Sequence, residues 1–154
     1  MATPEERLAE LGLTLPDVVP PVAAYVPAVR TGNLVFTAGQ LPMRDGQLIA
    51  TGAVGGSVTP DRATECARQC ALNALAAVRA EVGSLSAITR VVKAVVFVAS
   101  TTDFTGQPVV ANGASELLGE VFGDAGRHAR SAVGVAELPL GAPVEVELIV
   151  EIGE

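Results

Sequence analysis

The C-terminal segment VEVELIVEI, residues 144–152, constrains the fold more than any other stretch of the chain. Three glutamates, Glu145, Glu147 and Glu151, fall on one set of alternating positions, and the other set is apolar throughout: Val144, Val146, Leu148, Val150 and Ile152. Successive side chains of a strand point to opposite faces of a sheet, so this pattern predicts a strand with its apolar face in the core. With residues 138–141 as a connector, we expect residues 130–152 to form a β-hairpin.

Further strands are predicted upstream. The β-branched run ITRVVKAVVFVAS, residues 88–100, suits a central strand that is covered on both faces. In YVPAVRTGNLVFTAGQLP, two apolar stretches flank a Gly-Asn turn, which predicts strands near residues 25–30 and 33–38. A Gly-rich region follows and indicates loops around a short strand at 47–50. The proline-rich segment 15–29 is expected to be extended and to lie at a sheet edge.

Helical signals complete the order of elements. The clearest helix is indicated by apolar residues that recur at helical spacing. Thr59-Pro60 marks its start and Gly83 caps its end. A second helix is expected within residues 103–122 and starts properly only beyond Pro108. A short helix begins with Thr3 as its N-cap. The whole predicts a single α+β domain over residues 1–154, a mixed sheet with two long helices on one face and residues 1–19 as an N-terminal extension.

Composition limits the partners of this domain. Apolar residues make up 49% of the 154 residues but aromatic residues only 3%, so the core is aliphatic, and this much aliphatic surface suggests a homo-oligomer. The net charge is -7 and no Lys/Arg cluster is present, which argues against a nucleic-acid partner. The N-terminus lacks a signal-peptide pattern and no apolar stretch is long enough to span a membrane, so we expect a cytoplasmic protein that does not bind membranes.

Few residues are available for cofactor chemistry. Cys66 and Cys70 lie four apart on one helix face and are expected to be a reduced, buried pair. His128 is the only histidine, so a metal site has almost no ligands to draw on. No phosphate-binding motif of the P-loop or Rossmann type is present. We therefore expect neither a metal nor a cofactor.

Two motifs carry a family resemblance. The stretch ARSAVGVAELPLGAPVEVELIV, residues 129–150, resembles the C-terminal signature of the Rid (YjgF/RidA) family of reactive-intermediate deaminases. The stretch YVPAVRTGNLVFTAGQLP, residues 25–42, is similar to the N-terminal hairpin of the same family. The resemblance extends over about residues 20–152. The chain is longer than typical deaminases, which suggests a less characterised branch.

The resemblance implies a chorismate-mutase-like fold that assembles as a homotrimer with clefts at the subunit interfaces. It also implies hydrolysis of short 2-imino acids, in their imine or enamine forms, to 2-keto acids and ammonia without a metal or cofactor. Arg130 corresponds to the arginine that binds the substrate carboxylate, and Glu145 to the acid that positions or activates water. The pocket positions implied by the family are Tyr25, Ala38, Gly39, Asn112 and Ala132.

Each of these residues also has an ordinary explanation. From spacing alone, Arg130 is a surface arginine that pairs weakly with an acidic neighbour. Glu145 shares its strand face with Glu147 and Glu151, and such charged faces are usually just solvated or paired. Tyr25 could pack at an edge, Asn112 could be a helix-surface residue, and His128 near a turn is not counted in the site. A second hypothesis is a non-catalytic trimer of the same family that binds a small ligand or has a regulatory role.

Overall fold

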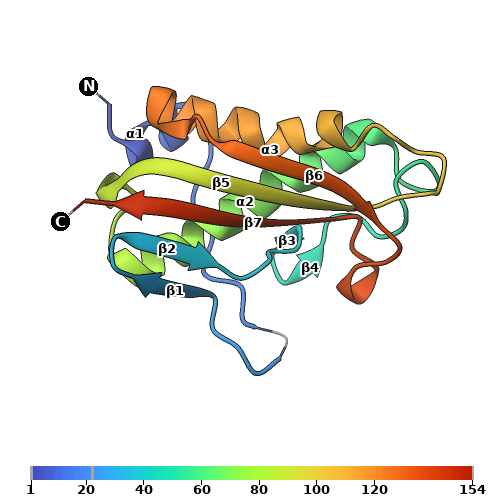
Figure 1. The fold of residues 1–154 in the computed structure, drawn as a ribbon, viewed down its shortest axis with the longest axis horizontal. Coiled ribbons are helices and arrows are strands. Elements are labelled where there is room, and N and C mark those ends of the chain that lie inside the picture. The colour runs from blue at the N-terminus through green and yellow to red at the C-terminus, as the bar shows by residue number, and fades with distance from the viewer. Residues whose placement is uncertain (1, 22, 154) are drawn as a thin grey trace.

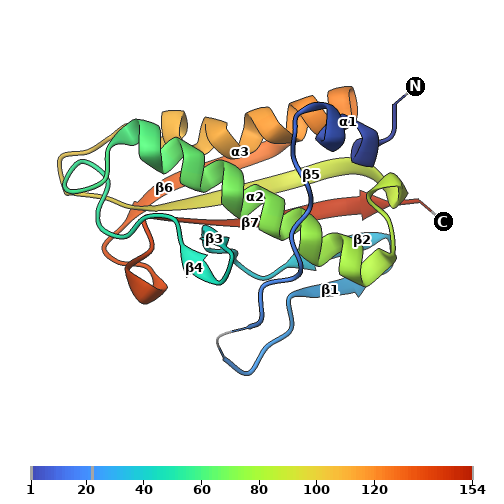
Figure 2. The same cartoon turned by 180° about the vertical axis from the view of Figure 1, so that it is seen from behind.

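The computed structural model describes residues 2–21 and 23–153, and in this part of the chain five strands form one mixed sheet. Figure 1 shows the sheet in front of two long helices, and Figure 2 shows the same helices from behind. In the order in which they lie side by side, the strands are β1 (Ala28–Thr31), β2 (Leu34–Thr37), β7 (Val144–Ile152), β5 (Ile88–Ala99) and β6 (Ala129–Val135). The predicted α+β architecture is confirmed.

Strands β6 and β7 do not form the predicted hairpin. β5 lies between them, pairing in parallel with β6 and antiparallel with β7. The chain reaches β6 from β5 through a crossover helix, as a parallel pair requires, and then crosses β5 to reach β7. The alternation at residues 144–152 was correctly interpreted as a half-buried strand, but the hairpin pairing was wrong.

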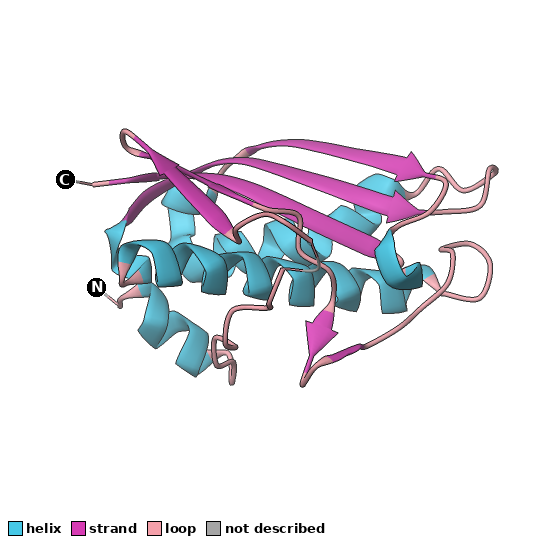
Figure 3. Cartoon of the chain, turned by 90° about the horizontal axis from the view of Figure 1, so that it is seen from below, coloured by secondary structure: helices cyan, strands magenta, loops and turns pink. Residues whose placement is uncertain are grey.

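The helices cover one face of the sheet, as predicted. Helix α2 (Pro60–Val82) begins after the Thr59 N-cap and ends at Gly83, and α3 (Gln107–Phe122) packs beside it. Pro108 lies within the first turn of α3, so this helix starts one residue before Pro108 and not beyond it. Proline is tolerated there because the first-turn N–H groups have no partner within the helix. Figure 3 shows the sheet as one layer and the helices as the other.

Short elements complete the structure. Thr3 caps α1 (Pro4–Glu10) with a capping box that includes Glu6, and the short strands β3 (Met43–Arg44) and β4 (Gln47–Leu48) pair with each other. The strands predicted near 25–30, 33–38 and 47–50 correspond to β1, β2 and β4. Each is shorter than predicted, and β1 also ends one residue later, at Thr31. Three 3₁₀ turns occur in the described residues: η1 (Leu85–Ala87), η2 (Gly123–Gly126) and η3 (Pro139–Gly141). None of the helices in the described residues has the length and apolarity needed to cross a membrane.

Among the described residues, no helix packs on the second face of the sheet. The predicted central strand β5 has strands on both sides, but only one of its faces is covered within this chain. The uncovered face has exposed apolar side chains on three strands: Val29, Phe36 and Val133. We call it the open face.

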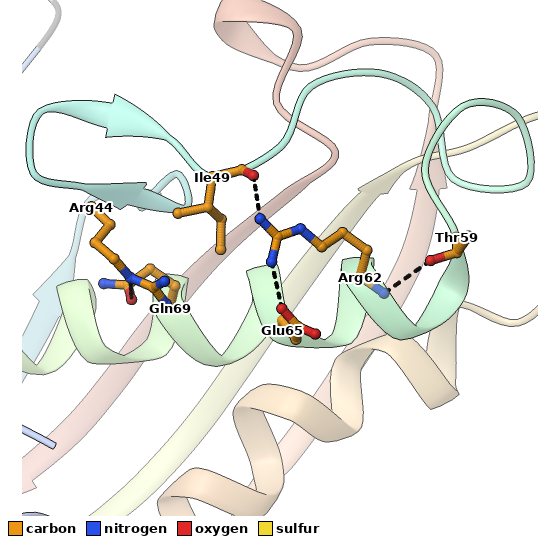
Figure 4. A network of polar contacts seen from close by, with 6 residues as sticks. All are labelled: Arg44, Ile49, Thr59, Arg62, Glu65 and Gln69. Carbon is orange, nitrogen blue, oxygen red and sulfur yellow. Dashed lines mark hydrogen bonds and ion pairs between the residues drawn. The ribbon is translucent and has the colours of Figure 1, made fainter. Parts of the chain in front are cut away.

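Polar contacts attach the loop after β2 to helix α2 (Figure 4). The guanidinium of Arg62 donates to the Ile49 carbonyl at 2.6 Å and to Glu65 at 2.5 Å, and Nε of Arg44 donates to Gln69 at 3.1 Å. The buried Asn73 donates to the carbonyls of Leu41 and Met43 at 2.9 and 3.0 Å. These bonds fix residues 41–49 on the helix and so define where the preceding residues of the loop can lie.

Candidate functional site

Arg130 is the second residue of β6, an edge strand that runs alongside α3 (Figure 1). In the β5–β6 register it pairs with the buried Ala94, so its side chain points to the helix-covered side of the sheet. Its Nη1 donates to Oδ1 of Asn112 at 2.8 Å and to Oγ of Ser115 at 3.2 Å, and its Nη2 donates to the carbonyl of Pro108 at 3.2 Å. The structure therefore brings together two predicted site residues, Arg130 and Asn112.

Helix α3 supplies all three acceptors. Pro108, Asn112 and Ser115 follow one another at spacings of four and three, which places them on one face of a helix. All three accept as neutral groups, and no described carboxylate pairs with Arg130. Its Nε–H and one Nη2–H also have no acceptor among the described residues. These bonds orient the Arg130 guanidinium but do not pair its positive charge with a carboxylate.

Sequence reasoning excluded His128, but the structure places it beside Arg130. The His128 Nε2 lies 2.8 Å from Oγ of Ser115, and its Nδ1 lies 2.6 Å from the carbonyl of Gly126. A shallow pocket of about 330 Å³ is lined by Arg130, His128 and Ser115 among others. One signal was available, because His128 is only two residues before Arg130, although it precedes β6 and is not part of the strand.

Glu145 is half-buried on the open face at the start of β7. Burial raises the pKa of its carboxyl, and repulsion from Glu147 raises it further. No described residue donates a hydrogen bond to this carboxylate. A Cβ built on Gly39 would lie 2.5 Å from its Oε2, so the absence of a side chain at Gly39 is what lets the carboxylate approach the backbone.

Two more predicted residues lie at this end of the sheet. Ala38 precedes Gly39, and its N–H donates to the carbonyl of Pro27 at 2.8 Å. Tyr25, two residues before Pro27, is an exposed residue with 44% of its surface accessible. Gln40, which follows Gly39, both donates a backbone hydrogen bond to Val146 of β7 and accepts one from it. We call Tyr25, Ala38, Gly39 and Glu145 the glutamate half.

The other predicted residues form a second group. Ala132 lies two residues after Arg130 on β6 and packs against the core. We call Asn112, Ser115, His128, Arg130 and Ala132 the arginine half. In one chain the two halves do not meet. Glu145 of β7 and Val133 of β6 both pair with the same residue of β5, which lies between them, and Val133 is three residues after Arg130. The side chains of Arg130 and Glu145 also point to opposite faces of the sheet. These spacings put the Cα atoms of Arg130 and Glu145 roughly 14 Å apart.

The two cysteines lie on α2 and belong to neither half. Cys66 and Cys70 are free and buried, as predicted. Burial raises the pKa of the Cys66 thiol to about 11 and that of Cys70 well above its usual value, so neither is a ready thiolate at neutral pH. Within residues 2–21 and 23–153, no group of three or more His, Cys, Asp or Glu side chains is placed to hold a metal ion.

The sequence matches the model of the family described as Endoribonuclease L-PSP over residues 7–152. Protein TCP17 of Trypanosoma cruzi is 47% identical over 147 residues, which cover 95% of this chain and 92% of that protein. The 2-iminobutanoate/2-iminopropanoate deaminase of Dermatophagoides farinae is 33% identical over 140 residues, which cover 91% of this chain and 94% of that protein.

A solved structure agrees with these relatives. The crystal structure of Atu1372, a protein of unknown function from Agrobacterium tumefaciens, superposes with a TM-score of 0.92 at 50% identity and covers 97% of this chain and 92% of that one. The match therefore extends over the arginine half, the glutamate half and the sheet between them. The chain belongs to the Endoribonuclease L-PSP family, which is the YjgF/RidA family that its two motifs resemble.

Proposed function

We propose that the protein hydrolyses short 2-imino acids to 2-keto acids and ammonia, with Arg130 binding the substrate carboxylate. The observation that carries this proposal is the set of neutral acceptors around Arg130. They orient the guanidinium on α3 but leave its charge unpaired, and the Nε–H and one Nη2–H are free of described acceptors. A planar carboxylate is the ligand that such a fork binds with two hydrogen bonds.

Glu145 is the group that we propose to position and activate the attacking water. Water adds to the imine carbon to form a C–O bond, the C–N bond then breaks, and the nitrogen leaves as ammonia while the carbon becomes the keto carbonyl. An ionised Glu145 accepts a proton from the attacking water and passes it to the nitrogen of the resulting carbinolamine. As the C–N bond breaks and ammonia leaves, the carbinolamine hydroxyl loses its proton to Glu145, and from there to solvent. The protonated imine is already electrophilic, so the main requirements are orientation and a positioned water, and no cofactor takes part.

Two copies of the chain complete the proposed site. The two halves are too far apart, and on opposite sides of the sheet, to act on one small substrate within a single chain. The arginine half lies on an edge strand, and the open face carries exposed apolar residues, so both surfaces are suited to contact with another copy. We propose a homotrimer in which the arginine half of one subunit meets the glutamate half of the next.

The test is keto-acid release when 2-iminobutanoate or 2-iminopropanoate is generated in situ, with wild type compared with Arg130→Ala. Wild type should accelerate release over the uncatalysed rate, and at low substrate concentration Arg130→Ala should lose most of this acceleration. Arg79→Ala is the matched control, since Arg79 is also half-buried but makes no side-chain hydrogen bond to a described residue. No acceleration by wild type would contradict the deaminase function. Equal activity in Arg130→Ala would contradict only the assignment of the site.

A second candidate is a non-catalytic trimer that binds a small carboxylate. The contrast between the halves supports this candidate. Arg130 is fixed by three hydrogen bonds, as a binding group would be, whereas no described residue donates a hydrogen bond to the Glu145 carboxylate. Binding of a keto acid that depends on Arg130, with no acceleration of imine hydrolysis, would identify this function.

Ribonuclease activity, which the family's description names, receives less support from this chain. Its net charge is -7, and it has one histidine. Binding to a phosphate backbone depends on a concentrated positive surface. We therefore do not propose RNA as the substrate.

A further inference from the structure

We infer that His128, acting through Ser115, is a positioning residue that holds the Arg130 guanidinium in its ligand-binding orientation. This inference rests on the proposed function of Arg130 as the carboxylate-binding residue. It extends the site by two residues that do not themselves need to touch the substrate.

The hydrogen bonds of His128 have only one consistent direction when its ring is neutral. The carbonyl of Gly126 can only accept, so Nδ1, at 2.6 Å, carries the ring hydrogen. The Nε2 lone pair then accepts from the hydroxyl of Ser115 at 2.8 Å. Because the single hydroxyl hydrogen is used in this way, Oγ of Ser115 presents its lone pairs to Nη1 of Arg130 at 3.2 Å.

Without His128, the hydroxyl of Ser115 has a competing partner. A serine inside a helix readily donates to the carbonyl four residues earlier, which here is the carbonyl of Ala111. That rotation would turn the Oγ lone pairs away from Arg130. The imidazole prevents it by accepting the hydrogen on the other side.

The anchor of His128 is itself rigid. Gly126 is buried at the end of η2, and a Cβ on it would collide with the carbonyl of Leu118 in α3. The turn therefore packs directly against the helix that carries Ser115. The carbonyl that fixes the imidazole and the hydroxyl that the imidazole fixes thus belong to one packed unit.

The experiment is a double-mutant cycle on ligand binding. 2-Oxobutanoate is titrated by calorimetry into wild type, His128→Phe, Ser115→Ala and the double variant. Each single variant should weaken binding about tenfold, the loss expected for a hydrogen bond to a charged group, and the double variant should be no weaker than either. His128→Gln, which retains an acceptor, should recover part of the loss. Glu120→Gln is the control: Glu120 lies on the same helix as Ser115, and the change removes its ion pair with Arg68 of α2 without touching a bond of Arg130.

Three results would overturn the inference. If His128→Phe binds like wild type while Arg130→Ala does not bind, the positioning role fails and the proposed function stands. If the two single losses add in the double variant, His128 does not act through Ser115. If binding does not depend on Arg130, the proposed function fails, and a crystal structure of His128→Phe is then needed to test the inference. We expect the Arg130 guanidinium to move away from Ser115 in that structure. A guanidinium in its wild-type position would contradict the inference.

Discussion

At the β6 edge, Arg130 is held by three hydrogen bonds to α3, whereas at the β2–β7 end no described residue donates a hydrogen bond to the Glu145 carboxylate. The arginine half is fixed by side chains of its own chain. The glutamate half is shaped by the absence of one, since Gly39 leaves room for the carboxylate. Under the proposed function, the carboxylate-binding group is positioned by its own chain, whereas the group proposed for water has no hydrogen-bond donor among the described residues.

The largest expected effect comes from the arginine half. Arg130→Ala removes the charged fork and should lower kcat/KM for 2-iminobutanoate by about a thousandfold, as the loss of one partner from a hydrogen-bonded charge pair implies. Steady-state kinetics should show that most of the loss appears as a higher KM. An unchanged KM with a lower kcat would contradict a binding role.

A change in the glutamate half should lower kcat and leave ligand binding nearly unchanged. Glu145→Gln keeps the size of the side chain but cannot accept the proton of water, so kcat should fall by about a hundredfold. Binding of 2-oxobutanoate, measured by calorimetry, should stay close to that of wild type. If Glu145→Gln abolishes binding and leaves the turnover of bound substrate intact, the roles of the halves have been exchanged.

The third prediction tests how α3 supports the arginine half. A Cβ on Gly113 would collide with the backbone carbonyl of Thr64 in α2, so Gly113→Ala should separate the helices and destabilise the protein by about 1–3 kcal/mol. The matched variant is Gly119→Ala on the same helix, where a Cβ meets nothing within 4 Å. It should stabilise the protein by about 0.5–1 kcal/mol through helix propensity. Urea unfolding of both variants checks the signs, and shifts of the same sign would contradict the close helix contact.

The smallest effect concerns the charge next to Glu145. Activity that needs ionised Glu145 should decline as the pH falls through its raised pKa. Burial is the main cause of that raised pKa and Glu147 the second, so Glu147→Gln should move the acidic limb of the kcat profile to lower pH without removing it. A limb that moves to higher pH, or does not move, would show that the two carboxylates do not interact.

The local elements were predictable because their signals are local. Helix α2 begins after Thr59 and ends at Gly83, where an N-cap residue and a glycine mark its two ends. The alternation in residues 144–152 correctly gave the buried face of β7. Strand partners were not predictable in the same way, because alternation fixes which face is buried and not which strand lies alongside. The β6–β7 hairpin was wrong for that reason, since β5 lies between the two strands.

The candidate site was predictable in parts. The structure brings Arg130 next to Asn112 and Glu145 next to Gly39, but it does not bring the two pairs together in one chain. His128 was considered as a base close to Arg130 but left out of the site, because a single histidine near a turn is more often exposed and idle. Its contact with Ser115 depends on how α3 docks along β6, which the sequence alone does not specify.

The most direct test of the two-subunit site is complementation between the two impaired variants, assayed at a substrate concentration well below KM. Arg130→Ala and Glu145→Gln subunits with different affinity tags are co-expressed, and oligomers that contain both are purified with the two tags in turn. Each mixed trimer then holds one interface with an intact arginine half and an intact glutamate half, so imine hydrolysis should return to about one third of the wild-type rate. If the mixed oligomers are no more active than the two variants alone, the site is not shared between subunits and the account is wrong.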